Sequence, residues 1–249
     1  MFDLDGCVWT GDVLSPGAGD CLRALHAAGR KLGFITNNSR ATGADIRRKL
    51  EGLGVTAGDA TLTPLDIIGE TIAERFGRSR VLVIGADELA DMVRRAGHEI
   101  VDVKDYRRAT VVAVGNDFDL SYERLTVAAR AAAAGAPLVT PNVDPRLPVE
   151  GGEFLPGCGA IIAAVAAAAG VQPIVVGKPE APLFHMALKR LGLAAHEAAM
   201  VGDSLPSDIE GGRRVGMRTV LYAPEGAPPD ARADAIVTSF AELARLAGV

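Results

Sequence analysis

Short runs of β-forming residues alternate with longer helical patterns along the whole chain, and this alternation constrains the fold more than any other feature. Several of the short runs are apolar throughout, which is typical of strands covered on both faces. Strands that alternate with helices in this way form a parallel sheet that is flanked by the helices. The sequence therefore predicts an α/β protein with a doubly wound, Rossmann-like parallel sheet.

The expected elements are short strands and longer helices separated by turns. We expect strands at residues 1–4, 31–35, 81–84, 111–114, 137–139, 174–176 and 199–201. We expect helices at residues 17–28, 44–53, 66–76, 86–95, 122–134, 159–169 and 183–191, and a short last helix after a Pro- and Ala-rich loop at 223–234. In such sheets, functional groups gather at the carboxyl ends of the strands, where loops meet helix N-termini.

Polar clusters follow four of the predicted strands. They are Asp3-Leu4-Asp5-Gly6, Thr36-Asn37-Asn38-Ser39, Gly177-Lys178-Pro179, and the segment from Gly202-Asp203 to Asp208. The stretch between the second and third clusters has its own strand–helix alternation but no comparable acidic cluster. We therefore expect a catalytic core formed by residues 1–77 and 173–249, with an α/β cap domain inserted at residues 78–172.

The carboxylates at these strand ends suggest phosphate chemistry. Asp3 and Asp5 are two residues apart, so both side chains can face the same side of the strand end. Carboxylates this close repel each other unless a cation or a shared proton relieves them. With Asp203 from another strand end, they form the hard oxygen set that Mg²⁺ prefers. One carboxylate can then attack phosphorus to form an aspartyl-phosphate, while the other protonates the leaving alcohol and later takes a proton from water.

The remaining clusters supply what this reaction needs. Thr36 and the backbone amides of Asn37 and Asn38 offer donors for phosphate oxygens at a helix entry. Lys178 supplies a fixed positive charge for the transferring phosphoryl group, and Asp208 can hold Lys178 or a metal-bound water in place. Each motif alone is more typical of a turn, a helix cap or a strand exit. Their joint order at alternating strand ends favours a phosphate site.

In this order, the motifs resemble those of haloacid dehalogenase superfamily phosphatases. The specific likeness is to the p-nitrophenyl phosphatase and phosphoglycolate phosphatase-like branch, which has a large α/β (type IIA) cap. The four core motifs are matched by residues 2–6, 34–39, 176–179 and 201–209, and three cap segments by residues 114–117, 142–145 and 155–157. The resemblance therefore extends over nearly the whole chain.

The resemblance implies a magnesium-dependent phosphomonoesterase with Asp3 as nucleophile and Asp5 as general acid/base. Magnesium is expected at Asp3, Asp203 and the backbone carbonyl of Asp5. The residues expected to bind the phosphate are Thr36, Asn37, Asn38 and Lys178. In the cap, the substrate-facing loops of this branch correspond to Asn116, Arg146 and Leu147, although an exposed Arg146 is also explained as a solvated loop charge.

The chain departs from the family pattern in two places. Ser207 stands where the family often has Thr, which preserves the hydroxyl group. Only Met1 and Phe2 precede Asp3, whereas family members carry several apolar residues there. Two residues supply few ladder groups for a central parallel strand, which either missing upstream residues or a true start further upstream would explain.

Composition restricts the partners. The formal net charge of -5 argues against a dedicated nucleic-acid binder, whose surface is normally basic. The longest apolar run, at 160–169, is too short to span a bilayer. Cys7, Cys21 and Cys158 are few and show no close pairing, which favours a reducing compartment. We expect a cytoplasmic protein that binds a small phosphorylated metabolite, without a nucleic-acid polymer or a membrane as partner. A homodimer formed through the cap is left open.

Other functions stay open at this point. A phosphotransferase or mutase of the same superfamily would use the same residues but deliver the phosphoryl group to a sugar. A dehalogenase is disfavoured because Asp5 and Asp203 fit phosphate chemistry. A non-catalytic phosphate-binding regulator is the third alternative, although an isolated receiver domain has about half this length. The ester is also open, with phosphoglycolate, glycerol phosphate, pyridoxal phosphate, sugar phosphates and nucleoside monophosphates as candidates.

Overall fold

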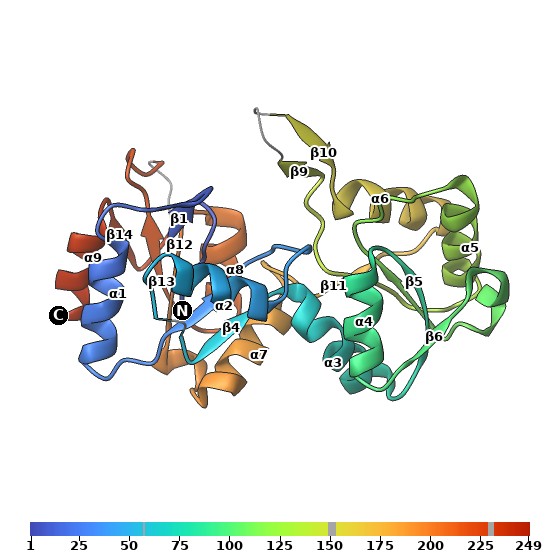
Figure 1. Ribbon diagram of the computed structural model, residues 1–249, viewed down its shortest axis with the longest axis horizontal. Helices are drawn as coiled ribbons and strands as arrows, with labels where there is room; N and C mark the ends of the chain where they lie inside the picture. Colours follow the sequence, from blue (N-terminus) through green and yellow to red (C-terminus); the bar gives the residue numbers. More distant parts are fainter. Residues whose placement is uncertain (57, 149–152, 229–231) are drawn as a thin grey trace. The chain divides into compact units, whose positions relative to one another are not determined.

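The structure is a computed structural model that describes residues 1–56, 58–148, 153–228 and 232–249. The chain divides into two compact units (Figure 1). The first comprises Met1–Thr36, Ala41–Thr63 and Lys178–Val249, and the second comprises Asn37–Arg40 and Pro64–Gly177. Each unit contains its own parallel sheet, so the predicted parallel α/β fold is confirmed.

The first unit contains the chain's first and last segments. Its strands are β1 (Trp9–Thr10), β2 (Val13–Leu14), β3 (Gly33–Ile35), β4 (Ala60–Leu62), β12 (Ala199–Gly202), β13 (Arg218–Tyr222) and β14 (Ala235–Val237). Its helices are α1 (Ala18–Ala27), α2 (Gly43–Gly52), α7 (Ala181–Leu191), the 3₁₀ turn η3 (Ala195–Glu197), the π-helical turn η4 (Leu205–Ile209), α8 (Glu210–Arg214) and α9 (Phe240–Ala247). Helices α1 and α9 lie side by side (Figure 1).

The backbone at Phe2 joins the two halves of the first unit's sheet. Strands β3 and β4 form one parallel pair, and β12, β13 and β14 form a parallel trio. Phe2 makes parallel bridges to Phe34 in β3 and to Val201 in β12, so it occupies the centre of the sheet. The segment expected as a strand at 1–4 therefore lies in the predicted place, but its parallel pairing is limited to the bridges at Phe2. The backbone turns at Leu4, whose carbonyl accepts hydrogen bonds from the amides of Cys7 and Trp9 instead of continuing the ladder.

Large buried side chains fill the space between this sheet and its helices. Trp9, Leu22, Phe34, Leu50 and Phe240 are each 2% exposed or less and belong to one hydrophobic cluster. They come from β1, the helices α1, α2 and α9, and the sheet itself. This core fixes the strands whose carboxyl ends carry the acidic residues.

The second unit follows the same α/β plan. Its strands are β5 (Arg80–Ile84), β6 (Glu99–Val101), β7 (Val111–Val114), β8 (Leu138–Thr140), β9 (Arg146–Pro148), β10 (Phe154–Pro156) and β11 (Ile174–Val175). Its helices are α3 (Pro64–Phe76), α4 (Asp87–Arg95), the 3₁₀ segment η1 (Val103–Arg108), α5 (Tyr122–Ala133) and α6 (Cys158–Ala169). Strands β9 and β10 form a separate antiparallel hairpin.

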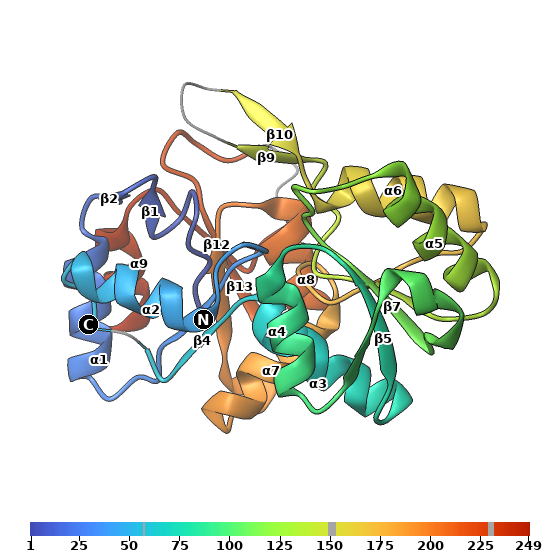
Figure 2. The same ribbon diagram turned by 45° about the vertical axis from the view of Figure 1, so that its right-hand side comes forward.

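The sheet of the second unit has the strand order β11-β8-β7-β5-β6, all parallel. Alternate residues such as Leu82, Ile84, Val112 and Val114 pack with α5 and α6, which lie next to each other, and Figure 2 shows α3 and α4 together on the other side of the sheet. The boundary predicted near residue 78 lies after α3. The contacts place α3 in the second unit because it packs against α4.

Several strands were not predicted from the sequence. They are β4, β6, β13 and β14 in the two sheets, and the strands of the β1–β2 and β9–β10 hairpins. Most have two or three residues, too few for a periodic pattern to show. None of the helices in the described part of the chain combines the length and the apolar character that crossing a bilayer requires.

Candidate active site

Three carboxylates gather at the carboxyl edge of the first unit's sheet. Asp3 follows the central bridge at Phe2, and Asp203 follows β12. Because these two segments are parallel neighbours, the residues that follow them leave the sheet at the same edge. Asp208, from η4, joins them, and one carboxylate oxygen of each of the three residues lies within 4.8 Å of the others.

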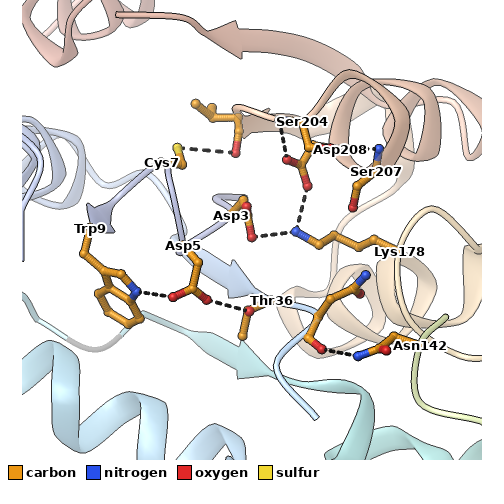
Figure 3. Close-up of polar contacts among 12 residues, drawn as sticks. Asp3, Asp5, Cys7, Trp9, Thr36, Asn142, Lys178, Ser204, Ser207 and Asp208 are labelled. Carbon is orange, nitrogen blue, oxygen red and sulfur yellow. Dashed lines mark hydrogen bonds and ion pairs between the residues drawn. The ribbon is translucent and has the colours of Figure 1, made fainter. Parts of the chain in front are cut away.

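Lys178 points between two of these carboxylates (Figure 3). Its Nζ lies 2.5 Å from Oδ1 of Asp3 and 2.7 Å from Oδ1 of Asp208. Lys178 and Asp208 are 4% and 0% exposed, so this ion pair is shielded from water. A buried charge of this kind is tolerated only where partners of opposite sign and hydrogen bonds compensate for lost hydration.

Two glycines make room for the acidic side chains. A Cβ atom on Gly6 would lie 2.3 Å from Oδ2 of Asp203, and Gly6 also has a φ of 88°, which favours glycine. A Cβ atom on Gly202 would lie 2.3 Å from Oδ2 of Asp208. The backbone amide of Ser204 donates a hydrogen bond to that same oxygen, at 3.1 Å. The carboxylates of Asp203 and Asp208 are thus packed directly against the backbone.

Burial and crowding change the acidity of these groups. Burial raises the pKa of Asp3 to about 7, although Lys178 acts in the opposite direction. The pKa of Asp203 is also raised, by burial and then by the neighbouring charge of Asp208. Burial lowers the pKa of Lys178, but the carboxylates of Asp3 and Asp208 more than offset it, so the net shift is upward. Three carboxylates thus lie close together beside one lysine, and a divalent cation would relieve the burial and crowding that raise their pKa values.

Asp5 lies near the cluster in sequence but its side chain has different contacts. Nε1 of Trp9 donates to Oδ1 of Asp5 at 2.8 Å, and Oγ1 of Thr36 donates to Oδ2 at 3.1 Å (Figure 3). Asp5 is exposed, whereas Asp3 is only 7% exposed. The two aspartates of the first motif thus sit in distinct environments, one buried beside a lysine and one accessible between two neutral donors.

The other residues expected at the phosphate belong to the second unit. Asn37 and Asn38 lie in the segment Asn37–Arg40, which clusters with that unit. The carbonyl oxygen of Asn37 accepts a hydrogen bond from Nδ2 of Asn142 at 2.7 Å. Oδ1 of Asn38 accepts from the backbone amide of Arg40 at 2.9 Å. The described contacts thus attach this segment to the second unit.

The three residues expected at the leaving group are also in the second unit. Asn116, after β7, is 5% exposed, and its Nδ2 donates to Oγ of Ser39 at 2.9 Å. Arg146 is exposed on the β9–β10 hairpin, with its guanidinium 4.4 Å from the ring centroid of Phe154. Leu147 pairs with Leu155 of β10. The structure therefore brings Asp3, Lys178, Asp203 and Asp208 together, and separately Asp5 and Thr36.

Sequence reasoning missed two neighbours of these predicted residues. None of the sequence motifs includes Trp9, although it is the one tryptophan of the chain and follows the first motif closely. Asn142 belongs to a cap motif without an assigned role, yet its side chain holds the backbone of Asn37. The contact of Trp9 with Asp5 depends on the turn between them, and that of Asn142 with Asn37 joins residues 105 positions apart, so neither has a local signal in the sequence.

Comparisons with known proteins connect both ends of the chain to one family. Residues 1–99 match the model of haloacid dehalogenase-like hydrolases, and residues 175–243 match a HAD-hydrolase-like model. The human glycerol-3-phosphate phosphatase is 34% identical to the chain, over 89% of the chain and 77% of that protein. The sugar-phosphatase AraL of Bacillus subtilis is 30% identical, over 99% of the chain and 92% of that protein.

Solved structures show the same fold. The p-nitrophenyl phosphatase from Archaeoglobus fulgidus superimposes with a TM-score of 0.88 and 28% identity, over 99% of this chain and 97% of that one. A glycerol phosphate phosphatase from Mycobacterium tuberculosis, solved in complex with magnesium, has a TM-score of 0.84 and 32% identity, over 98% of this chain and 76% of that one. These likenesses span both units, with nearly the whole chain included.

Proposed function

Because the chain belongs to the haloacid dehalogenase-like hydrolase family and is a phosphatase, we propose that it cleaves the phosphate monoester of a small metabolite through an aspartyl-phosphate formed on Asp3. One observation carries this proposal. The Asp3 carboxylate is buried and held by Lys178, while Asp5, two residues away, is exposed and held separately. One motif thus provides a fixed nucleophile and an accessible acid/base.

The reaction has two balanced halves. In the first, an Asp3 oxygen attacks phosphorus in line, the bond from phosphorus to the leaving oxygen breaks, and Asp5 gives its proton to that oxygen. In the second, Asp5 takes a proton from water, the water oxygen attacks phosphorus, and the bond to Asp3 breaks to release phosphate. A single carboxyl group can serve as acid and then as base because the first half leaves it ionised.

Lys178 and Asp208 prepare the nucleophile. The ammonium group of Lys178 donates to Asp3, which fixes one carboxylate oxygen and leaves the other for attack. Asp208 orients Lys178 from the opposite side. A fixed positive charge at this point also stabilises the negative charge of the transferring phosphoryl group.

Magnesium fits the donor set of the cluster. The carboxylates of Asp3, Asp203 and Asp208 are hard oxygen donors with ligand atoms within 4.8 Å of one another, and their charge exceeds that of Lys178. We propose that Asp3, Asp203 and the backbone carbonyl of Asp5 hold the ion, with Asp208 next to it. When bound, the ion would neutralise charge on the phosphate oxygens.

Substrate recognition completes the proposal. We assign the phosphate oxygens to Thr36, Asn37, Asn38 and Lys178, and the leaving group to Asn116, Arg146 and Leu147. We propose a catalytic core at residues 1–77 and 173–249 and a cap at residues 78–172. The acidic cluster of the first unit supports the core, although the contacts place residues 64–77 and 173–177 in the second unit. The glycerol-3-phosphate and sugar phosphatases among the relatives support glycerol phosphate or a sugar phosphate as the substrate class.

A phosphate-release panel with Mg²⁺ tests the proposal. It contains glycerol 3-phosphate, several sugar phosphates, phosphoglycolate, pyridoxal phosphate, nucleoside monophosphates and p-nitrophenyl phosphate. We expect steady release of inorganic phosphate, fastest from a glycerol or sugar ester. If a sugar acceptor captured the phosphoryl group in place of water, the protein would be a phosphotransferase. Absence of turnover on every ester would contradict the proposal.

Two further parts of the proposal concern the protein's surroundings. The buried thiols of Cys7, Cys21 and Cys158 support a cytoplasmic location. A homodimer formed through the cap rests on the family resemblance alone. Light scattering coupled to gel filtration measures the mass and decides between monomer and dimer.

A further inference from the structure

Trp9 holds the side chain of Asp5 in one orientation. The two carboxylate oxygens of Asp5 each accept a separate hydrogen bond, Oδ1 from the indole Nε1 of Trp9 and Oδ2 from Oγ1 of Thr36. An exposed aspartate without such contacts rotates among several rotamers. With a donor fixed at each oxygen, rotation about the last side-chain bond would break both hydrogen bonds.

The indole itself is held rigidly. Trp9 is 1% exposed within the hydrophobic cluster of the first unit. Its backbone amide donates to the carbonyl of Leu4 at 3.0 Å, and its carbonyl accepts from the amide of Gly6 at 2.8 Å. These hydrogen bonds close the tight loop that carries Asp5, so the backbone at the ring is tied to the backbone at the carboxylate.

A cation lies over the ring of Trp9. Nζ of Lys49 is 4.8 Å from the ring centroid, and it also donates to the carbonyl of Gly11 at 2.7 Å and pairs with Asp12 at 2.9 Å. A positive charge against the face of an indole is attracted to its electron-rich π-system. It draws electron density towards itself and so makes the indole N–H a better donor. Lys49 thus supports the hydrogen bond to Asp5 from its place over the face of the ring.

We propose that Trp9 is a positioning residue that keeps the Asp5 carboxyl group in place for proton transfer to the leaving oxygen. This inference rests on the proposed function, in which Asp5 gives a proton as the bond from phosphorus to the leaving oxygen breaks and the bond from phosphorus to Asp3 forms. Proton transfer depends on geometry, because the acid must lie within hydrogen-bonding distance of the leaving oxygen. Trp9 itself touches neither substrate nor metal in this scheme.

The leaving group distinguishes positioning from general structural support. The alkoxide that leaves glycerol 3-phosphate needs a proton to depart, whereas p-nitrophenolate departs without one. The ratio kcat/KM reports the steps up to release of the leaving group, and so excludes the later attack of water. Loss of Asp5 orientation should therefore lower kcat/KM for glycerol 3-phosphate much more than kcat/KM for p-nitrophenyl phosphate.

The unique tryptophan allows an atom-level test. Expression in a tryptophan auxotroph with 3-benzothienylalanine replaces the indole N–H by sulfur and retains the ring shape. We expect kcat/KM for glycerol 3-phosphate to fall about tenfold, a part of the 10²–10⁴-fold effect of a general acid, with a loss of less than about threefold for p-nitrophenyl phosphate. Trp9→Phe should behave in the same direction, and thermal unfolding of both proteins monitors the fold.

Two controls separate the possible causes. Asp5→Asn should show the same leaving-group dependence with a larger loss. Phe240→Leu, a change at a buried aromatic residue of the same cluster, should affect both esters equally if it affects them at all. An equal loss on both esters, or no loss, in the folded benzothienylalanine protein would overturn the role of Trp9 and leave the proposed function intact. A wild-type protein that cleaves neither ester, or an Asp5→Asn protein without leaving-group dependence, would overturn the assigned chemistry and this inference with it.

Discussion

In both units, polar residues follow buried strands, but the number of carboxylates for each basic side chain differs between the units. After β7 in the second unit, Asp117 pairs with Arg124 at 2.6 Å, one carboxylate with one guanidinium, and its Oδ1 accepts from the amide of Asp119. In the first unit, three carboxylates gather near Lys178, and the pKa values of Asp3 and Asp203 are raised. A single carboxylate paired with one guanidinium fits a structural role, whereas three carboxylates beside one lysine mark a site that a further cation would balance.

The two units also differ in the neutral side chains at their strand ends. The strand ends of the second unit also present Asn116 and Asn142, whose amides bind the segment Asn37–Arg40 without charge. Amides can orient a ligand or a loop but cannot attack phosphorus or transfer a proton at neutral pH. Under the proposed function, the same α/β plan thus provides chemistry at one sheet edge and contacts at the other.

The largest expected effect is on the nucleophile. Asp3→Asn removes the attacking carboxylate, so turnover of every ester should fall by about 10³-fold or more. Phosphate release is the measurement, with circular dichroism to verify the fold. Asp20→Asn, at an exposed aspartate paired with Arg23, is the matched control and should retain wild-type rates. A folded Asp3→Asn protein with normal turnover would remove the distinction between the two sheet edges.

Removal of the divalent ion should come next in size. Thorough chelation should lower activity by about 10²-fold or more, because the cluster would then face a phosphate dianion without charge compensation. Ca²⁺ should restore activity poorly, since it takes more ligands at longer distances. Mg²⁺ should also raise the melting temperature of the chelated protein, and Asp203→Asn should reduce that rise. Full activity after chelation would show that the acidic cluster does not hold a metal ion that the reaction needs.

The sequence predicted several strands of both sheets, and the aspartates that follow two strands of the first unit, because these have strong local signals. Continuous apolar runs identified β5, β7 and β12, and the polar clusters that follow buried strands located Asp3 and Asp203. The resemblance supplied the roles of these residues. Strands such as β4 and β14 were missed because three residues beside Gly or Asp carry little periodicity, and they pair only because a neighbouring strand is already in place.

The remaining misses depend on tertiary contacts. The β9–β10 hairpin includes Pro148 and Pro156, which lack a backbone donor and so argue against strands in a sequence pattern. The hydrogen bond from Trp9 to Asp5 depends on the turn between them, and the attachment of Asn37 to Asn142 spans 105 residues. No local pattern contains such information.

A smaller effect, on stability alone, is expected from the balanced pair of the second unit. Arg124→Met leaves the carboxylate of Asp117, which is 3% exposed, without its guanidinium partner. The free energy of unfolding should fall by about 1–3 kcal/mol. Urea denaturation measures this change. At urea concentrations below the unfolding transition, kcat for p-nitrophenyl phosphate should stay near the wild-type value. A large loss of kcat with unchanged stability would show that this pair also takes part in the reaction.

The smallest effect should come from Arg146 and depend on the substrate. Arg146 is exposed and stacks on Phe154, so Arg146→Ala should cost little stability. If its guanidinium contacts the leaving group, kcat/KM should fall about tenfold for esters that carry a carboxylate or a second phosphate, such as phosphoglycolate. The value for p-nitrophenyl phosphate, which offers no anionic group there, should barely change.

Arg107→Ala is the matched control, because Arg107 is another exposed arginine of the same unit, 4.8 Å from the ring centroid of Tyr106. Equal kinetics of Arg146→Ala, Arg107→Ala and wild type across anionic and neutral esters would identify Arg146 as a solvated charge, and leaving-group recognition would then rest on uncharged groups alone.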